Sequence, residues 1–567
     1  MPSLSFRSAR AHSADSSPRH RRLRWPDISG VSDRTLLISI GLIALILRVT
    51  ELILIPTSSY PDADWYVTLA RQIAAGHGLT IPYIWNWVDV GAGIPLHPIL
   101  PIPAGAHWLP GAAFLALPGV LAGGTDFLVH LPFVIVAAGL PMLGFLVGRR
   151  LFVRRRYALM TAFAVALPGV VTSTLDQPDN MGLFALLAGI ALYSVGRLIE
   201  GAEPRWRWRV LAGVSLGLAA WSRPDAVLIA LAIGLLVIWR SRIRIRDIAA
   251  IAGITGLIVA PWAIRQLAVF GSISPSSSTG RILWIRTYNE LFMAGGPLTP
   301  DHLLAWPGLL ASRLAGIVDV SFHASLYLGW VVAGPIVLIG VIRLARRSPL
   351  ARVFLLAFLI HAVWSALVAT AHVDSGNYLH GVTVYLLIAG AGLIEGGRWI
   401  ANLLRRFWPG SRPIRYMMAR ATLPVLLVWV IICTITSSYV HQGVESAGST
   451  AERAAVAVAL RDLPANMVIL SAEPGLVWTT SGHPGVPTPI DGPELVKAAI
   501  RSYHVGAWLV LDSDLKLSFA PSLIDPATRP SWIGTPQPIY ATIPDLSGAT
   551  HSELYATLLP ILAMPPP

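Results

Sequence analysis

The sequence has little charge, a single cysteine and almost no lysine. Only 13% of its 567 residues are charged, whereas 54% are hydrophobic and the mean hydropathy is +0.62. Soluble domains of ordinary composition carry about 25% charged residues, so this class of protein is excluded. The lone cysteine, Cys433, excludes an internal disulfide and any zinc site built from several cysteines.

Lysine occurs only at positions 497 and 516, so the net charge of +13 comes almost entirely from arginine. The arginines cluster in short loops between apolar runs, which is typical of cytoplasmic loops in membrane proteins and not of a nucleic-acid-binding face. The high ratio of arginine to lysine also suggests a GC-rich, bacterial genome. The arginine-rich loops are 149–156, 205–209, 240–246, 343–352 and 398–420.

Long apolar runs recur from Leu36 to Val440, and a membrane span needs about 20 such residues. We therefore predict an α-helical polytopic membrane protein with about eleven transmembrane helices, a cytoplasmic N-terminus and an outer C-terminus. The two shortest spans flank Ser222–Asp225 and form either two crossings or one broken pair. The predicted spans are roughly 36–55, 127–148, 157–175, 181–199, 210–221, 226–239, 248–264, 322–342, 353–371, 379–396 and 421–440.

Three regions follow from these runs. Residues 1–34 form a disordered, basic cytoplasmic N-terminus, and residues 35–440 form the transmembrane module, with outer loops at 57–126 and 265–306. Within the first of these loops, His107–Ala122 is predicted to be a juxtamembrane or re-entrant helix. Residues 441–567 form a small extracytoplasmic α/β domain. Its predicted helices are Thr450–Asp462 and Gly492–Tyr503, and its strands are Met467–Ser471 and Trp508–Asp512.

The outer loop after the first span contains two carboxylates two positions apart, Asp62 and Asp64. They are suited to deprotonating an acceptor or to holding a divalent metal, for a substrate whose tail lies in the bilayer. Capping of the following helix by Asp62 is the structural alternative. Trp65, Tyr66 and Leu69 predict an amphipathic helix that lies at the membrane interface.

Several stretches of the chain resemble GT-C membrane glycosyltransferases, and most closely the branch of protein O-mannosyltransferases and lipid A aminoarabinose transferases. The resemblance spans roughly residues 36–400. Members of this branch often have adjacent Asp-Glu in the first loop, but here Ala63 follows Asp62, so the base remains open between Asp62 and Asp64. The stretches are Asp62–Tyr66, Leu69–Gly78, Gly213–Asp225 and Ala260–Gly271, preceded by Arg48 near the outer end of the first span.

The resemblance implies an inverting glycosyltransferase that takes a sugar from a polyprenyl-phosphate donor and gives it to an extracytoplasmic glycan, lipid or protein. A phosphate leaving group departs without a strong general acid, so one carboxylate that takes the acceptor proton is enough. The phosphate needs cations, and arginine provides bidentate hydrogen bonds. The outer arginines proposed for this role are Arg223, Arg265, Arg281 and Arg286.

Other residues on the outer side are candidates for lining the acceptor cavity. Asp179 lies at an outer turn, where it either caps the next helix or orients the acceptor. Arg48 and Glu51 lie one turn apart within a span and are expected to form an ion pair. The remaining candidates are Tyr66, His372, Tyr378 and His380.

Two other functions remain open from the sequence. A secondary transporter or lipid flippase of the cell envelope would place charged residues near the middle of the membrane and would show inverted repeats. The sequence shows no internal repeat, and its isolated charges gather at the outer boundary. A non-catalytic scaffold for envelope assembly would tolerate loss of both Asp62 and Asp64.

Overall fold

A computed structural model describes most of the chain, and the statements below refer to the described residues. The predicted disordered N-terminus falls almost entirely outside them, although Asp33 and Arg34 already belong to the first helix. The described residues are 30–55, 61–238, 243–275, 281–368, 380–438, 444–511, 514, 517, 519–545 and 549–565.

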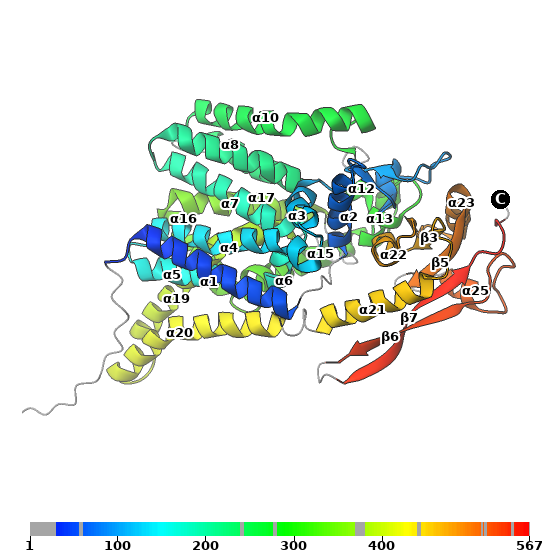
Figure 1. Cartoon of the computed structure of the whole chain (residues 1–567). Coiled ribbons are helices and arrows are strands. Elements are labelled where there is room, and N and C mark those ends of the chain that lie inside the picture. Colours follow the sequence, from blue (N-terminus) through cyan, green and yellow to red (C-terminus); the bar gives the residue numbers. More distant parts are fainter. Residues whose placement is uncertain are drawn as a thin grey trace, which may run out of the picture.

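The larger part of the chain is a bundle of helices that run side by side (Figure 1). Their apolar sequences explain the helices, because backbone groups in a membrane must be satisfied within each segment. The helices are α1 (Asp33–Leu54), α2 (Asp62–Ala74), α3 (Gly111–Leu121), α4 (Asp126–Leu151), α5 (Arg155–Ala166), α6 (Thr172–Asp176), α7 (Asn180–Ile199), α8 (Arg205–Ser222), α9 (Ala226–Ile238), α10 (Ile245–Phe270), α12 (Arg281–Trp284), α13 (Tyr288–Met293), α14 (Pro300–Leu304), α15 (Leu309–Leu328), α16 (Gly334–Arg347), α17 (Pro349–Val368), α19 (Leu386–Phe407) and α20 (Arg412–Ser437). Short 3₁₀ helices are η1 (Trp87–Val90), η2 (Gly169–Val171) and η3 (His380–Tyr385), and the first outer loop pairs β1 (Thr80–Ile81) with β2 (Ile102–Pro103).

Eight helices of the described chain are long and apolar enough to cross a membrane, or nine if the bent pair 155–166 and 169–176 forms one span. The polytopic membrane fold is thus confirmed. The predicted crossings 210–221 and 226–239 are the helices α8 and α9. Both fall short of these criteria, because α8 carries three arginines and α9 has only 13 residues. The predicted juxtamembrane segment contains α3, a short apolar helix of 11 residues.

One predicted span is wrong. The segment 322–342 is not continuous, because α15 ends at Leu328 and α16 begins at Gly334. Between them Trp330 and Val331 adopt positive φ angles of 44° and 71°. Trp330 is fully buried, and its indole nitrogen donates to the carbonyl of Leu167 at 2.7 Å. The break therefore places a large aromatic side chain inside the bundle, which hydrophobicity alone does not reveal.

Helices α16 and α19 approach each other closely because glycines line their contact. A Cβ atom on Gly340 would overlap the carbonyl oxygen of Gly392, and one on Gly396 would overlap that of Ile336. Small residues allow such backbone contact between membrane helices. This pair anchors the half of the bundle that contains α17 and η3.

The C-terminal part is a small α/β domain, as the sequence predicted, and its sheet has five strands. The sheet has the order β4-β3-β5-β7-β6, in which β3 is parallel to β4 and β5, and β7 is antiparallel to β5 and β6. The predicted helices and strands correspond to α21, β3, α23 and β5, but the hairpin β6–β7 was not predicted. The elements are α21 (Glu445–Leu460), β3 (Val468–Ser471), α22 (Pro474–Ser481), β4 (Gly485–Pro487), α23 (Pro493–Tyr503), β5 (Val505–Leu511), α25 (Ala520–Ile524), β6 (Gln537–Pro544) and β7 (Thr550–Pro560).

The sheet domain shares a hydrophobic core with the first outer loop. Trp65 and Tyr66 of α2 belong to the same buried cluster as Ile500 of α23 and Trp508 of β5. The backbone N–H of Ile84 also donates to the carbonyl of Gly485 at 2.9 Å. The C-terminal domain is therefore packed directly on the loop that contains the candidate carboxylates.

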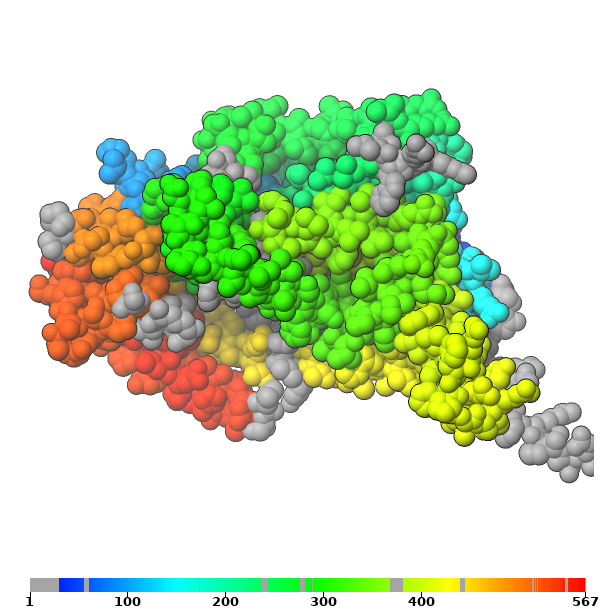
Figure 2. Space-filling view, turned by 180° about the vertical axis from the view of Figure 1, so that it is seen from behind, coloured from blue at the N-terminus to red at the C-terminus, as the bar shows by residue number. Residues whose placement is uncertain are grey.

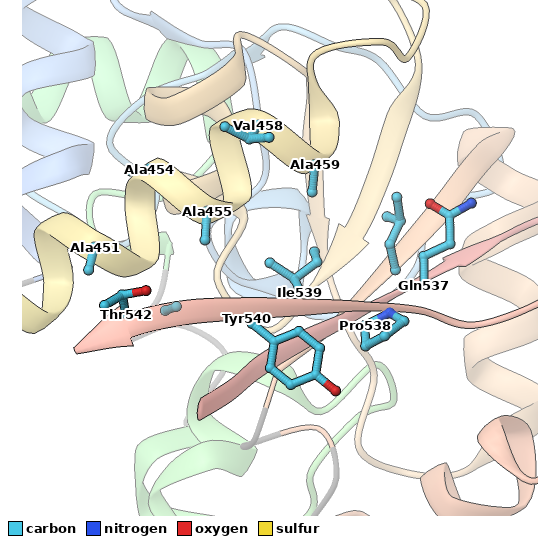
Figure 3. Close-up of a pocket in the computed structure, with 12 residues that line it drawn as sticks. Ala451, Ala454, Ala455, Val458, Ala459, Gln537, Pro538, Ile539, Tyr540 and Thr542 are labelled. Atoms are coloured by element: carbon cyan, nitrogen blue, oxygen red, sulfur yellow. The ribbon is translucent and has the colours of Figure 1, made fainter. Parts of the chain in front are cut away.

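The sheet domain has an apolar groove of about 650 Å³ between α21 and the edge strand β6. Alanines of α21 form one wall and Gln537–Thr542 of β6 form the other, with the ring of Tyr540 at its rim (Figure 3). Its lining contains no acid, base or histidine. The groove therefore has no group for general acid–base catalysis.

Candidate active site

The first-loop carboxylates lie in the first turn of α2, where the helix dipole favours negative charge. Pro61, and not Asp62, occupies the N-cap position, so the capping alternative for Asp62 is wrong. The predicted helix is present, but it does not lie open at the membrane interface. Trp65, Tyr66 and Leu69 are buried against protein, with exposed fractions of 1%, 0% and 0%.

Asp64 forms a two-point ion pair with Arg453 of α21. The Oδ1···Nη1 distance is 3.1 Å, the Oδ2···Nη2 distance is 2.8 Å, and Arg453 also donates to the hydroxyl of Thr479 at 3.1 Å. Burial raises the pKa of Asp64, while the Arg453 guanidinium opposes this shift. Since both of its oxygens contact Arg453, Asp64 joins α2 to the C-terminal domain.

A chain of polar groups runs from Tyr66 across the neighbouring ends of α7, α8 and α9. The side-chain amide of Asn180 donates to the Tyr66 hydroxyl at 2.5 Å, and its oxygen accepts a hydrogen bond from Arg223 Nη1 at 2.7 Å. Arg223 Nε donates to Asp225 Oδ2 at 2.6 Å. Ser222 fixes the backbone here by donating to the Asn180 carbonyl at 3.1 Å. The end of α8 and the start of α7 thus hold Arg223 close to α2.

Asp179 precedes α7 and is enclosed by this chain. It is 1% exposed, and neither of its carboxylate oxygens completes a hydrogen bond with a described residue. Burial raises the pKa of Asp179 to about 6, although nearby backbone amides and the charge of Arg223 favour the ionised form. Asp179 occupies the N-cap position of α7, as the structural alternative predicted, although its side chain completes no capping hydrogen bond. A buried acid with a raised pKa is also a candidate functional group.

The carboxylates of Asp62 and Asp179 both act on Tyr66. Burial raises the pKa of the Tyr66 phenol well above its ordinary value, and the negative charges of Asp179 and Asp62 raise it further. Asp62 is only half-buried, in contrast to Asp179. The structure therefore brings together four of the predicted residues, namely Asp62, Tyr66, Asp179 and Arg223.

His361 of α17 and Asn180 were not among the predicted residues. His361 is fully buried, and its Nε2 lies 3.8 Å from Asp225 Oδ1. Gly381 is packed against both side chains, since a Cβ there would lie 2.5 Å from His361 Cε1 and 2.7 Å from Asp225 Oδ2. A histidine within an otherwise apolar predicted span was the available sequence signal for this contact.

An apolar cavity of about 480 Å³ lies next to His361. Residues of α15, α16, α17, η3 and α19 line it, among them Leu328, Phe358, Ala362 and Tyr385. The rings of Tyr385 and His361 meet edge to face, with 6.0 Å between their centres. Tyr385, which lines the cavity, therefore connects it through His361 to Asp225, the partner of Arg223.

A second, more polar cavity of about 360 Å³ lies between α2, α4, α21 and α22. Asp64, Arg71, His130 and Arg453 are among its lining residues, and Pro178 borders it beside Asp179. The cavity therefore lies at the junction between the helical module and the sheet domain, on the side where Asp64 meets Arg453.

Arg48 and Arg265 occupy different surroundings. Arg48 forms the predicted ion pair with Glu51 at 3.2 Å, and it also contacts Asp176 Oδ2 at 3.1 Å, so it connects α1 to α6. Arg265 lies over the rings of Trp262 and Phe270 at 5.1 Å and 5.2 Å. These contacts give both arginines structural roles at their positions.

Arg281 and Arg286 are engaged within the outer loop 281–306. Arg281 is 1% exposed and donates to the carbonyls of Ala294 and Gly296, each at 2.6 Å. Arg286 donates through Nε to the carbonyl of His302 at 2.7 Å. The two guanidinium groups therefore stabilise the fold of this loop, and their predicted contact with a donor phosphate stays a prediction.

The loop 281–306 is attached to the C-terminal domain. The carboxylate of Asp491 accepts hydrogen bonds from the backbone N–H groups of Gly295 and Gly296, and Ile490 N–H donates to the carbonyl of Met293 at 3.2 Å. Figure 2 shows the green segment that contains this loop lying against the orange C-terminal domain.

Three further predictions concern histidines, Tyr378 and metals. His372 and Tyr378 lie outside the described residues, and so does the side chain of His380, whose backbone begins η3. Within the described part of the chain, no three His, Cys, Asp or Glu side chains group as a metal site. Asp62 and Asp64 are two positions apart on a helix, so their side chains leave it in directions about 200° apart around its axis. Asp64 also forms an ion pair with Arg453.

Comparisons with known proteins agree with this geometry. Residues 107–264 match the family model of dolichyl-phosphate-mannose-protein mannosyltransferase, and this segment includes Asp179 and Arg223. No curated protein sequence matches the chain.

Solved structures resemble the whole chain. ArnT from Cupriavidus metallidurans, bound to undecaprenyl phosphate, superposes with a TM-score of 0.54 at 14% identity, over 93% of this chain and 97% of that one. The Archaeoglobus fulgidus oligosaccharyltransferase AglB, with an inhibitory peptide and a dolichol-phosphate, gives a TM-score of 0.53 at 13% identity, over 92% and 74%. The family model thus matches one segment of the chain, and the fold of nearly the whole chain is similar to that of these membrane glycosyltransferases, in agreement with the resemblance found in the sequence.

Proposed function

We propose that the protein is an inverting glycosyltransferase that moves a sugar from a polyprenyl-phosphate donor to an acceptor on the outer face of the membrane. The observation that carries this proposal is the convergence of Asp62, Asp179 and Arg223 around Tyr66, at one end of an apolar cavity. The two similar structures are bound to undecaprenyl phosphate and to dolichol-phosphate. Both molecules are polyprenyl phosphates, the same chemical class as the lipid part of the proposed donor.

The apolar cavity between α15, α16 and α17 is suited to the prenyl chain. It is lined almost entirely by apolar side chains, and it lies among helices that we assign to the membrane. Tyr385, His361 and Asp225 connect it to Arg223. A prenyl chain in this cavity would bring the phosphate to the Arg223 guanidinium.

The chemistry needs one base and one cation. The acceptor hydroxyl gives its proton to Asp62 while its oxygen forms a bond to the anomeric carbon of the sugar. The bond from that carbon to the phosphate oxygen breaks, and the polyprenyl phosphate leaves with the electron pair. Arg223 stabilises the charge that develops on the phosphate, and attack from the opposite face inverts the anomeric centre.

Asp62 is assigned as the base in preference to Asp64 and Asp179. Both oxygens of Asp64 contact Arg453, so this carboxylate is not available to an acceptor. Asp179 is 1% exposed, whereas Asp62 is half-buried at the first turn of α2, where an acceptor can reach it. Asp179 orients the Tyr66–Asn180–Arg223 chain through its negative charge, which acts on Tyr66 and Arg223.

The acceptor is a glycan, lipid or protein that enters through the polar cavity beside Asp64 and Arg453. We assign the sheet domain and loop 281–306 to the extracytoplasmic side and the N-terminus to the cytoplasm of a bacterial plasma membrane. The basis is the arginine distribution: Arg149, Arg205 and Arg343 lie at helix ends away from the sheet domain.

The test is turnover by the purified full-length protein with a panel of polyprenyl-phosphate sugars, in the presence and absence of EDTA. We expect release of polyprenyl phosphate that is lost in Asp62→Asn, and the EDTA arm decides whether a divalent ion takes part. Movement of the intact donor across liposomes without cleavage would instead support a flippase.

A further inference from the structure

Helices α19 and α20 meet in a hairpin at the end of the helical module that lies farthest from the sheet domain. We call residues 402–420 of this hairpin the α19–α20 tip. Figure 1 shows it projecting beyond the neighbouring helices, and Figure 2 shows it as a yellow knob at the edge of the molecule. Most of its side chains are exposed.

The tip is positively charged and contains no acidic residue. No Asp or Glu occurs between Glu395 and Glu445 in the sequence. No described carboxylate forms an ion pair with the arginines of the tip. These arginines are Arg405, Arg406, Arg412, Arg415 and Arg420.

This lack of partners contrasts with the other arginine clusters at the same end of the bundle. Each of those clusters surrounds a carboxylate, which neutralises part of its charge. The groups are Asp33 with Arg149 and Arg155, Glu200 with Arg150 and Arg197, Asp247 with Arg205 and Arg209, and Glu395 with Arg343, Arg347 and Arg398. The charge of the tip therefore has to be balanced from outside the chain.

Large apolar and aromatic side chains are exposed among these arginines. Phe407, Trp408, Tyr416 and Met417 have exposed fractions of 67%, 41%, 53% and 62%. Guanidinium groups lie over two of the rings, with Arg405 at 5.8 Å from the centre of Tyr416 and Arg406 similarly over Phe407. Aromatic rings mixed with arginine are typical of the boundary between lipid chains and headgroups.

We propose that the α19–α20 tip binds the phosphate groups of anionic phospholipids in the leaflet next to it. The tip joins two apolar helices, α19 and α20, so it lies where a bilayer surface begins. Arginine pairs with phosphate through two hydrogen bonds, and the exposed rings enter the adjoining acyl region. Basic clusters next to membrane spans bind anionic lipids by this combination.

The test is native mass spectrometry of the purified full-length protein after addition of phosphatidylglycerol or phosphatidylcholine. The wild type is expected to retain phosphatidylglycerol in preference to phosphatidylcholine. The variant Arg405→Gln/Arg406→Gln/Arg412→Gln should lose at least about half of the retained phosphatidylglycerol, because each arginine contributes to attraction by an anionic surface. The corresponding triple lysine variant keeps the charge and should retain most of it.

A matched control removes three exposed arginines elsewhere on the same side of the bundle, as Arg154→Gln/Arg207→Gln/Arg346→Gln. This variant should retain phosphatidylglycerol like the wild type. An equal loss in the two glutamine variants would show that only overall charge matters and would overturn the proposal. Unchanged retention in the tip variant would overturn it as well.

Discussion

Asp64 and Arg453 are separated by 389 positions in the sequence, yet their side chains form a two-point ion pair with distances of 2.8 Å and 3.1 Å. The pair connects the first turn of α2 to α21, and thus the helical module to the C-terminal domain. Asp64, which the sequence offers as a second candidate base, therefore holds two parts of the molecule together.

Breaking this pair should destabilise the protein, and exchanging its charges should restore part of the loss. Removal of one partner of a buried ion pair costs about 3 kcal/mol, so Arg453→Gln and Asp64→Asn should each lower the thermal unfolding temperature and the activity. The double exchange Asp64→Arg/Arg453→Asp should recover part of both. If the double exchange has no higher unfolding temperature and no higher activity than the single variants, Asp64 and Arg453 do not act through their pairing.

Asp62→Asn should reduce kcat by about 10²–10⁴-fold, the usual contribution of a general base. The unfolding temperature should change little, because Asp62 is half-buried at the start of a helix. Single-turnover rates with a polyprenyl-phosphate sugar provide the measurement, and Asp525→Asn on the surface of the sheet domain is the control. Wild-type rates in Asp62→Asn would remove this residue from the mechanism.

Asp179→Asn should lower activity and, at neutral pH, raise stability. The pKa of Asp179 is raised by burial from 3.8 to about 6, so its ionised form is disfavoured in the folded protein. Stability is therefore fully present below about pH 4 and decreases as pH rises through about 6, by about 3 kcal/mol in total. Thermal unfolding of both proteins between pH 4 and pH 8 should show curves that converge at the acidic end.

Arg223→Lys should lower activity strongly, because lysine does not reproduce the planar, two-point contact with a phosphate. A loss of about 100-fold or more in kcat/KM for the donor is expected. Arg286→Gln is the comparison, since Arg286 donates to the His302 carbonyl inside the outer loop. Equal losses in the two variants would mean that Arg223 has no special relation to the donor.

Ala362→Phe should distinguish long donors from short ones. Ala362 lines the apolar cavity next to His361, so a phenyl ring there would fill space that we assign to the prenyl chain. We expect a higher KM for donors with long prenyl chains and little change for a donor with a short chain. The same loss for both donors would indicate a general packing defect.

Much of the fold was accessible from the sequence. Apolar runs and arginine-rich loops located the helices α1, α4, α7 and α10, and periodicity located β3 and β5 of the sheet domain. The interruption at Trp330 was missed, because a buried indole and a tight turn leave the hydrophobicity of the segment unchanged. The hairpin β6–β7 was missed because it contains prolines and polar residues that weaken the signal of a strand.

The site was only partly accessible. Asp62, Tyr66, Asp179 and Arg223 were selected from their positions at the outer ends of predicted helices, and they do lie together. Arg281 could not be distinguished from a donor-binding arginine, since the carbonyls of Ala294 and Gly296 that it contacts are backbone groups without a sequence signature. Arg453 was not considered, because its partner is 389 positions away.

The hydrogen bonds from Gly295 and Gly296 to Asp491 have a mechanical consequence. The loop that covers the outer side of the bundle is attached to the sheet domain at this point, and the sheet domain holds α2 through Arg453. A displacement of this loop from the sheet domain must therefore break the hydrogen bonds to Asp491, and a displacement of the sheet domain from α2 must break the ion pair between Asp64 and Arg453.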